Sequence, residues 1–185
     1  MRAIRPLITL GAALLALTLP LRAQTREGLV GDLLKDIDGL QTKIVGLAKA
    51  IPTASYEWRP GKGVRSTGEV FMHVAADNYF LPAAMGVTPP SETGIVGKEY
   101  KTAVAFEQKK ATPEQIVAEL EKSFAFLKKA LTDTPDGKLD APLDVFGQKT
   151  TMRGLWFMTA THLHEHLGQL IAYARSNNVT PPWSK

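Results

Sequence analysis

Three of the four histidines in this 185-residue chain lie in one short stretch, THLHEHLGQL at 161–170. They are His162, His164 and His166, whereas the fourth, His73, lies far upstream. Neutral imidazole is a common ligand of divalent transition metals, so this crowding suggests a metal site. Because the chain contains no cysteine, such a site must use nitrogen and oxygen ligands. Catalysis by a thiol of the protein itself is excluded for the same reason.

The period of an α-helix separates the three neighbouring histidines. A helix advances about 100° per residue, so His166 lies about 40° from His162, whereas His164 lies about 200° away. Side chains four residues apart have Cβ atoms roughly 5–6 Å apart and can chelate one ion. We therefore expect His162 and His166 to act together, and His164 to be a surface or interface residue. The pair alone fits two hydrogen-bonded core histidines equally well.

The upstream histidine favours the metal site. His73 lies on the inward face of another predicted helix, with Asp77 one turn later. Three imidazoles from two helices leave one or more ligand positions open, which is typical of a catalytic metal site. Asp77 and Gln169 are placed to orient a ligand or a bound water from outside the ligand set. Ordinary polar residues at the ends of a core face explain these two equally well.

Two catalytic motifs are excluded by the spacing. The zinc-protease pattern H-E-x-x-H begins at His164, but its second histidine would have to stand at Gly168. No pattern of serine, histidine and aspartate indicates a nucleophilic triad.

Four segments of the chain have the apolar spacing of long amphipathic helices. The predicted helices cover 25–51, 66–82, 112–131 and 151–176. Capping boxes open the second helix at Ser66 and the third at Thr112. We expect long connections between them, with a short helix near Val104 and a short extended piece or turn in VFGQKTT. With no repeat or second core, the sequence predicts an all-α fold, a single four-helix bundle with long crossover loops.

Residues 1–23 have the features of a secretory signal peptide. They contain a cationic start, an apolar run of 13 residues and a small-residue ending at Ala23. The run is shorter than the roughly 20 residues that a membrane-spanning helix needs. We expect cleavage after Ala23, leaving a periplasmic or extracellular domain at 24–185 with no stable membrane anchor. An uncleaved N-terminal anchor is the alternative.

The net charge of the expected mature chain gives no sign of a nucleic-acid partner. The full chain has 22 basic and 18 acidic residues, a formal charge of +4. Three of the basic residues lie in 1–23, which has no acidic residue, so 19 basic and 18 acidic residues remain. A nearly neutral domain lacks the basic surface that nucleic-acid binding requires.

Two segments resemble the DinB-like (DinB/YfiT) superfamily of metal-dependent enzymes. They are YEWRPGKGVRSTGEVFMHVAADNYF and FGQKTTMRGLWFMTATHLHEHLGQLIAYARSNNVTPPWS, the second with H-x-x-x-H followed by G-Q, Y-x-R and P-P. The likeness spans 24–185. It implies a four-helix bundle that binds a divalent metal, zinc or nickel, through His73, His162 and His166. Many members carry an arginine where this chain has Leu167, so no role of that arginine is carried over.

Two classes of function remain open at this point. One is an exported metal-dependent hydrolase or transferase acting on a small-molecule substrate that the sequence does not identify. Export would separate it from the cytosolic thiols that some relatives use, which weakens the transferase interpretation. The other is a non-catalytic exported protein that binds metal or a partner, because no general base stands out.

The fourth predicted helix also carries apolar residues away from its histidine face. They are Trp156, Phe157, Leu163, Leu167 and Ile171. A helix that is apolar all round must be covered on all sides. Neighbouring helices can provide this cover, and so can a second copy of the chain. The family resemblance favours a homodimer.

Overall fold

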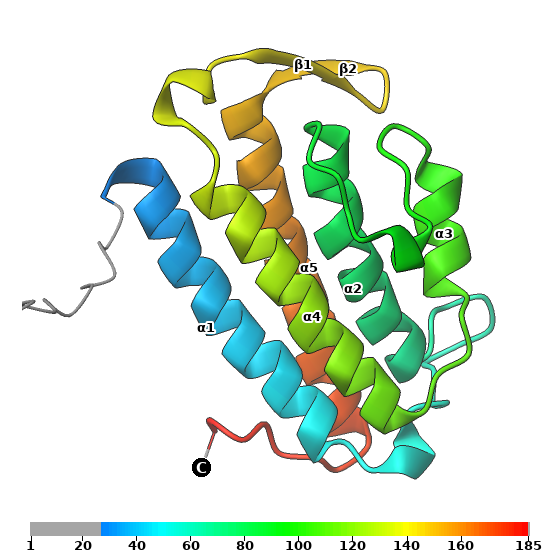
Figure 1. Ribbon diagram of the computed structural model, residues 1–185. Helices are drawn as coiled ribbons and strands as arrows, with labels where there is room; N and C mark the ends of the chain where they lie inside the picture. Colours follow the sequence, from blue (N-terminus) through cyan, green and yellow to red (C-terminus); the bar gives the residue numbers. More distant parts are fainter. Residues whose placement is uncertain (1–26, 185) are drawn as a thin grey trace, which may run out of the picture.

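Four long helices lie side by side in the computed structural model, which describes residues 27–184 (Figure 1). They are α1 (Gly28–Ala50), α2 (Thr67–Ala84), α4 (Pro113–Thr132) and α5 (Met152–Ser176). A short helix, α3 (Tyr100–Glu107), and an antiparallel hairpin of β1 (Pro142–Val145) and β2 (Gln148–Thr151) lie in the connections between them. The connections also contain three single-turn 3-10 helices, Thr53–Ser55, Ser91–Thr93 and Asp136–Lys138. The predicted all-α four-helix bundle with long connections is confirmed.

The local signals at the helix ends behave as the sequence predicts. The Ser66 hydroxyl accepts from the backbone N–H of Glu69 at 3.3 Å, and the Glu69 carboxylate accepts from the backbone N–H of Ser66 at 2.6 Å. Thr112 and Gln115 make the same reciprocal pair at the start of α4. These contacts satisfy backbone donors that a helix N-terminus leaves unpaired.

The first helix starts later than its apolar pattern suggests. Glu27 is extended, and α1 begins at Gly28 rather than near Thr25. The predicted signal peptide, residues 1–23, lies outside the described residues. Within 27–184, none of the helices combines the length and the apolar character required to cross a bilayer.

The helices pack in a ring in which α1 and α2 each contact both α4 and α5. The short helix α3 packs against α2 from outside this ring (Figure 1). As a result, every residue of α2 except Glu69 is buried. The sequence indicated one inward face for this helix, but α3 covers a second side as well. Polar side chains on α2 therefore sit in a low-dielectric environment where they need specific partners.

Neighbouring helices cover most of the apolar residues on the outer side of α5. Trp156, Leu163 and Leu167 are buried within the single chain, whereas the Phe157 side chain is half-exposed. The sequence allowed two ways to cover this apolar side, by neighbouring helices or by a second copy of the chain. Neighbouring helices cover most of it. The homodimer stays a prediction.

Candidate metal centre

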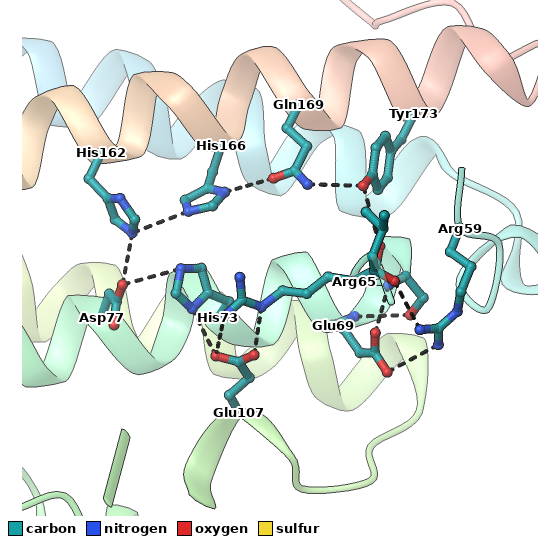
Figure 2. A network of polar contacts seen from close by, with 12 residues as sticks. Arg59, Arg65, Glu69, His73, Asp77, Glu107, His162, His166, Gln169 and Tyr173 are labelled. Atoms are coloured by element: carbon teal, nitrogen blue, oxygen red, sulfur yellow. Dashed lines mark hydrogen bonds and ion pairs between the residues drawn. The ribbon is translucent and has the colours of Figure 1, made fainter. Parts of the chain in front are cut away.

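Three imidazoles meet between α2 and α5 (Figure 2). His73 comes from α2, and His162 and His166 come from successive turns of α5. Each offers one ring nitrogen, and these three nitrogens lie within 4.8 Å of one another. The Nε2 atoms of His162 and His166 are 3.2 Å apart. The structure thus brings together the three residues that the helical period selected.

The opposite ring nitrogen of His166 has a polar partner behind it. Its Nδ1 lies 2.8 Å from Oε1 of Gln169, whose amide nitrogen donates to the Tyr173 hydroxyl at 2.9 Å (Figure 2). With the amide in this orientation, Nδ1 of His166 must donate, and its Nε2 keeps a lone pair facing the other histidines. A partner behind the ring that sets the tautomer in this way is typical of metal-binding histidines. Gln169 therefore lies where the sequence placed it.

His73 has a stronger partner, which the sequence did not reveal. Its Nδ1 lies 2.8 Å from Oε2 of Glu107, at the end of α3. Arg65 holds this carboxylate from the other side, with Nε 2.6 Å from Oε1 and Nη2 3.1 Å from Oε2. Burial raises the pKa of Glu107, but hydrogen bonds from His73 and Arg65 outweigh it and lower the pKa to about 2. Glu107 is therefore a carboxylate at neutral pH and favours an Nδ1–H on His73.

Asp77 lies among the ring nitrogens rather than behind the rings. Its Oδ2 is 2.8 Å from Nε2 of His162 and 3.3 Å from Nε2 of His73. Its Oδ1 is buried and has no hydrogen-bond partner among the described residues. The sequence predicted that Asp77 orients a ligand or water from outside the ligand set. The carboxylate contacts the Nε2 atoms of two of the three imidazoles, and its role towards a ligand or a water stays a prediction.

The polar contacts around these rings fit a bound cation. If His73 donates through Nδ1 to Glu107, its Nε2 lone pair faces the Asp77 carboxylate. The Nε2 lone pair of His166 likewise faces His162. A neutral His162 can donate its Nε2–H to Asp77 or to His166, but the His73 lone pair and the Asp77 carboxylate still face each other and repel. A divalent ion held by the three ring nitrogens would remove this repulsion without placing charged imidazoliums next to one another.

His164 points away from this centre. It extends from the outer side of α5 to Asp36 of α1, with its Nε2 3.0 Å from Oδ2 of that carboxylate. About half of its side chain, 54%, is exposed. An exposed polar contact of this kind contributes little to stability, roughly 0–1 kcal/mol. The predicted separation of His164 from its two neighbours is what the structure shows.

The pH dependence of stability offers a test of the buried imidazole. Burial lowers the pKa of His166 to about 4, from an ordinary value near 6.5 in the unfolded chain. Between these values the unfolded state binds the extra proton, so acid favours unfolding. We expect metal-free protein to lose stability as the pH falls from about 6.5 to about 4. The His166 share is at most about 1.4 kcal/mol per pH unit and is reduced by the partial exposure of the ring.

Denaturant unfolding of chelator-treated protein at pH 7 and pH 5 measures this effect. A His166→Gln variant lacks the titrating group, so its loss of stability between these pH values should be smaller than that of the wild type. Equal losses in the two proteins would mean that His166 keeps an ordinary pKa in the folded state.

The fold and this cluster define a helical-bundle protein with a candidate three-histidine metal centre. The sequence profile of the DinB superfamily matches residues 37–170, most of the chain. The chain therefore belongs to the DinB superfamily. No curated protein matches the sequence.

Solved structures share this fold at low sequence identity. A DinB-like protein from Bacillus subtilis is 19% identical, with a TM-score of 0.62 over 80% of this chain and 93% of that one. A DinB-like protein from Bacillus cereus is 18% identical, with a TM-score of 0.63 over 83% and 95%. A mycothiol-dependent maleylpyruvate isomerase is 15% identical, with a TM-score of 0.60 over 76% of this chain and 60% of that one. At these identities the likeness concerns the fold alone.

Proposed function

We propose that the protein is an exported metal-dependent hydrolase of a small-molecule substrate, with one divalent ion, zinc or nickel, bound by His73, His162 and His166. The observation that carries the proposal is the convergence of three imidazole nitrogens within 4.8 Å. Two of the rings have a partner at the opposite nitrogen, which prepares the converging nitrogens to bind metal. Three ligands leave a position for water or substrate.

Each residue around the site then has a distinct task. A divalent ion supplies Lewis-acid polarisation of a substrate oxygen and brings the pKa of water close to neutrality. Asp77 is placed to accept a proton, because its Oδ1 is buried and unpaired among the described residues. Glu107, held by Arg65, and Gln169, held by Tyr173, keep two of the imidazoles in position. His73 and Asp77 are buried in α2, against which α3 packs, so bulk water has little access to these two side chains.

A thiol-dependent transferase is the second candidate, favoured by the mycothiol-dependent isomerase among the structural neighbours. This chain has no cysteine, so the thiol would have to come from a co-substrate. An exported protein would be separated from cytosolic thiols, which favours hydrolysis. A non-catalytic metal-binding protein would need the same three histidines but not an Asp77 carboxylate whose Oδ1 has no partner among the described residues.

Metal analysis combined with an activity screen tests the proposal. We expect purified protein to contain about one divalent ion per chain, and a chelator to remove it. Ester, amide and thiol-transfer substrates are then offered to the metal-loaded and metal-free forms. Hydrolysis that tracks the metal content supports the proposal, whereas transfer that requires added thiol favours the second candidate. A protein that takes up no ion under metal-replete conditions would refute both.

A further inference from the structure

A cavity of about 260 Å³ opens at the end of the bundle where the β1–β2 hairpin crosses. Figure 1 shows this hairpin extending over the upper end of α2 towards the side of the bundle on which α3 lies. Phe80 and Ala84 of α2, Tyr100 of α3 and Phe146 of the hairpin turn form its apolar walls, and the charged residues Lys98 and Asp144 also line it. We call this space the aromatic cavity. It is distinct from the histidine cluster, with which it shares none of these residues.

The aromatic cavity continues the face of α2 that carries the site. His73, Asp77, Phe80 and Ala84 fall within about 60° of one another around the helix axis. Phe80 is about 4.5 Å farther along that axis than Asp77. The cavity therefore begins one helical turn beyond the Asp77 carboxylate, towards the C-terminal end of α2.

Tyr100 lines the aromatic cavity from the first residue of α3, the short helix whose last residue, Glu107, contacts His73. Its ring packs on Phe80, with centroids 5.3 Å apart, and on Phe146, with centroids 5.8 Å apart. The pKa of its hydroxyl is raised first by burial and then by the negative charges of Asp77 and Glu107. The polar end of Tyr100 thus lies in the field of the site carboxylates, while its ring belongs to the cavity wall.

Phe146 occupies a backbone position that suits an aromatic residue poorly. Val145 pairs with Gln148, so Phe146 and Gly147 form a two-residue turn, with φ of 56° and 72°. Asn-Gly is the favoured sequence for such a turn, because both residues need positive φ. A bulky side chain in this region is strained, and strain of this kind gathers at functional sites. The Phe146 ring is also 57% exposed, so burial within the chain does not explain it.

A second strained residue lines the same cavity. Lys98 has φ of 71°. Only three residues other than glycine have positive φ in the part of the chain described here, and two of them, Lys98 and Phe146, line the aromatic cavity. The third, Asn178, follows the end of α5, where asparagine commonly adopts this conformation.

We propose that the aromatic cavity binds an aromatic ring of the substrate while its reacting group lies at His73, His162 and His166. The inference rests on the proposed function in taking the histidines as the reacting centre. The three rings pack on one another with centroids 5.3–5.9 Å apart and together line the cavity, where their remaining edges and faces can contact a planar ring. The cavity volume suits one ring with a short substituent and not an extended chain.

Binding of hydroxamates to zinc-loaded protein tests the subsite without any knowledge of the reaction. Acetohydroxamate tests binding to the metal alone. Benzohydroxamate, phenylacetohydroxamate and 3-phenylpropionohydroxamate add an aromatic ring at increasing distance from the hydroxamate group. We expect calorimetry to show at least one aryl compound binding about tenfold or more tightly than acetohydroxamate, because the apolar surface of its ring is removed from water on binding. In metal-free protein, saturation-transfer NMR should show benzyl alcohol in contact with the wild-type cavity.

The Phe146→Asn variant removes the aromatic ring while keeping a residue that the turn accepts. Asparagine suits the turn, so we expect an unchanged or raised Tm. Acetohydroxamate affinity should stay the same, the aryl advantage should fall to within about twofold, and benzyl alcohol contact should be lost. Phe157→Ala is the matched control, because it removes a half-exposed phenylalanine of α5 that does not line the cavity. It should keep the aryl advantage in full.

The outcomes distinguish the subsite from the metal centre. If acetohydroxamate binds but no aryl compound binds more tightly, or if Phe146→Asn keeps the aryl advantage, the subsite is refuted and the metal centre stands. If acetohydroxamate fails to bind while benzyl alcohol contacts the wild type and not Phe146→Asn, the subsite stands and the open metal position is refuted. If neither probe binds, both are refuted.

Discussion

Replacing His166 with alanine should abolish stoichiometric metal binding. At a free metal concentration that gives about one ion per wild-type chain, we expect the variant to retain almost none. The Nε2 of His166 lies 3.2 Å from that of His162, and the two rings have centroids 4.4 Å apart. Removing a ligand should cost more than the roughly 10- to 100-fold loss of metal affinity that follows removal of a partner behind a ligand. Elemental analysis and competition with a chromophoric chelator measure both quantities.

His164→Ala is the matched control for this experiment. His164 lies two residues away on the same helix, but it points outward to Asp36. Alanine is a strong helix former, so both variants should keep the helical circular dichroism of the wild type. We expect His164→Ala to bind metal as the wild type does. Full metal content and affinity in folded His166→Ala would show that His166 is not a ligand.

Asp77→Asn should produce the second large effect, a loss of turnover with the metal still in place. The carboxylate contacts two of the three imidazoles, at 2.8 Å and 3.3 Å, and its other oxygen is buried. An amide of the same shape cannot take up a proton at that oxygen. Because general-base catalysis typically contributes about 10²–10⁴-fold, we expect kcat to fall by about that factor. The substrate is the best one from the hydrolysis screen, and the three imidazoles remain to bind the ion.

The wild type and Asp77→Asn are compared at equal metal loading. A variant of a carboxylate outside the site serves as the control. Asp36→Asn removes the surface partner of His164 and should leave kcat unchanged. The pH profile adds an independent readout, because the limb due to protonation of the base should disappear in Asp77→Asn. Equal kcat and equal pH profiles in fully loaded wild type and Asp77→Asn would show that Asp77 is not the base.

The candidate ligand set was accessible from the sequence because it depends on helix geometry. A spacing of four residues places His162 and His166 on one face, and the same period excludes His164. The inward face of the second helix identified His73 and Asp77. Gln169, three residues after His166, follows from the same period. Each of these inferences uses only the regular turn of a helix, which neighbouring residues determine.

Glu107 and Arg65 could not be found in this way. Glu107 lies 34 residues from His73, at the end of a short helix in a segment without a clear apolar period. Its contact with His73 exists only because α3 folds back against α2. The one available signal was the expectation of a short helix near Val104, and that expectation gave no direction in which the helix would pack.

By itself, the sequence determined the four long helices, two of their caps, the histidines that share a face and the membership of the superfamily that the profile match confirms. These follow from contacts between residues a few positions apart and from the spacing of apolar side chains. The tertiary structure alone decided that Asp77 lies among the ring nitrogens, that Glu107 stands behind His73, and that Phe146 faces Phe80. Those arrangements depend on how short, irregular segments pack against distant helices, where no period in the sequence specifies the partner.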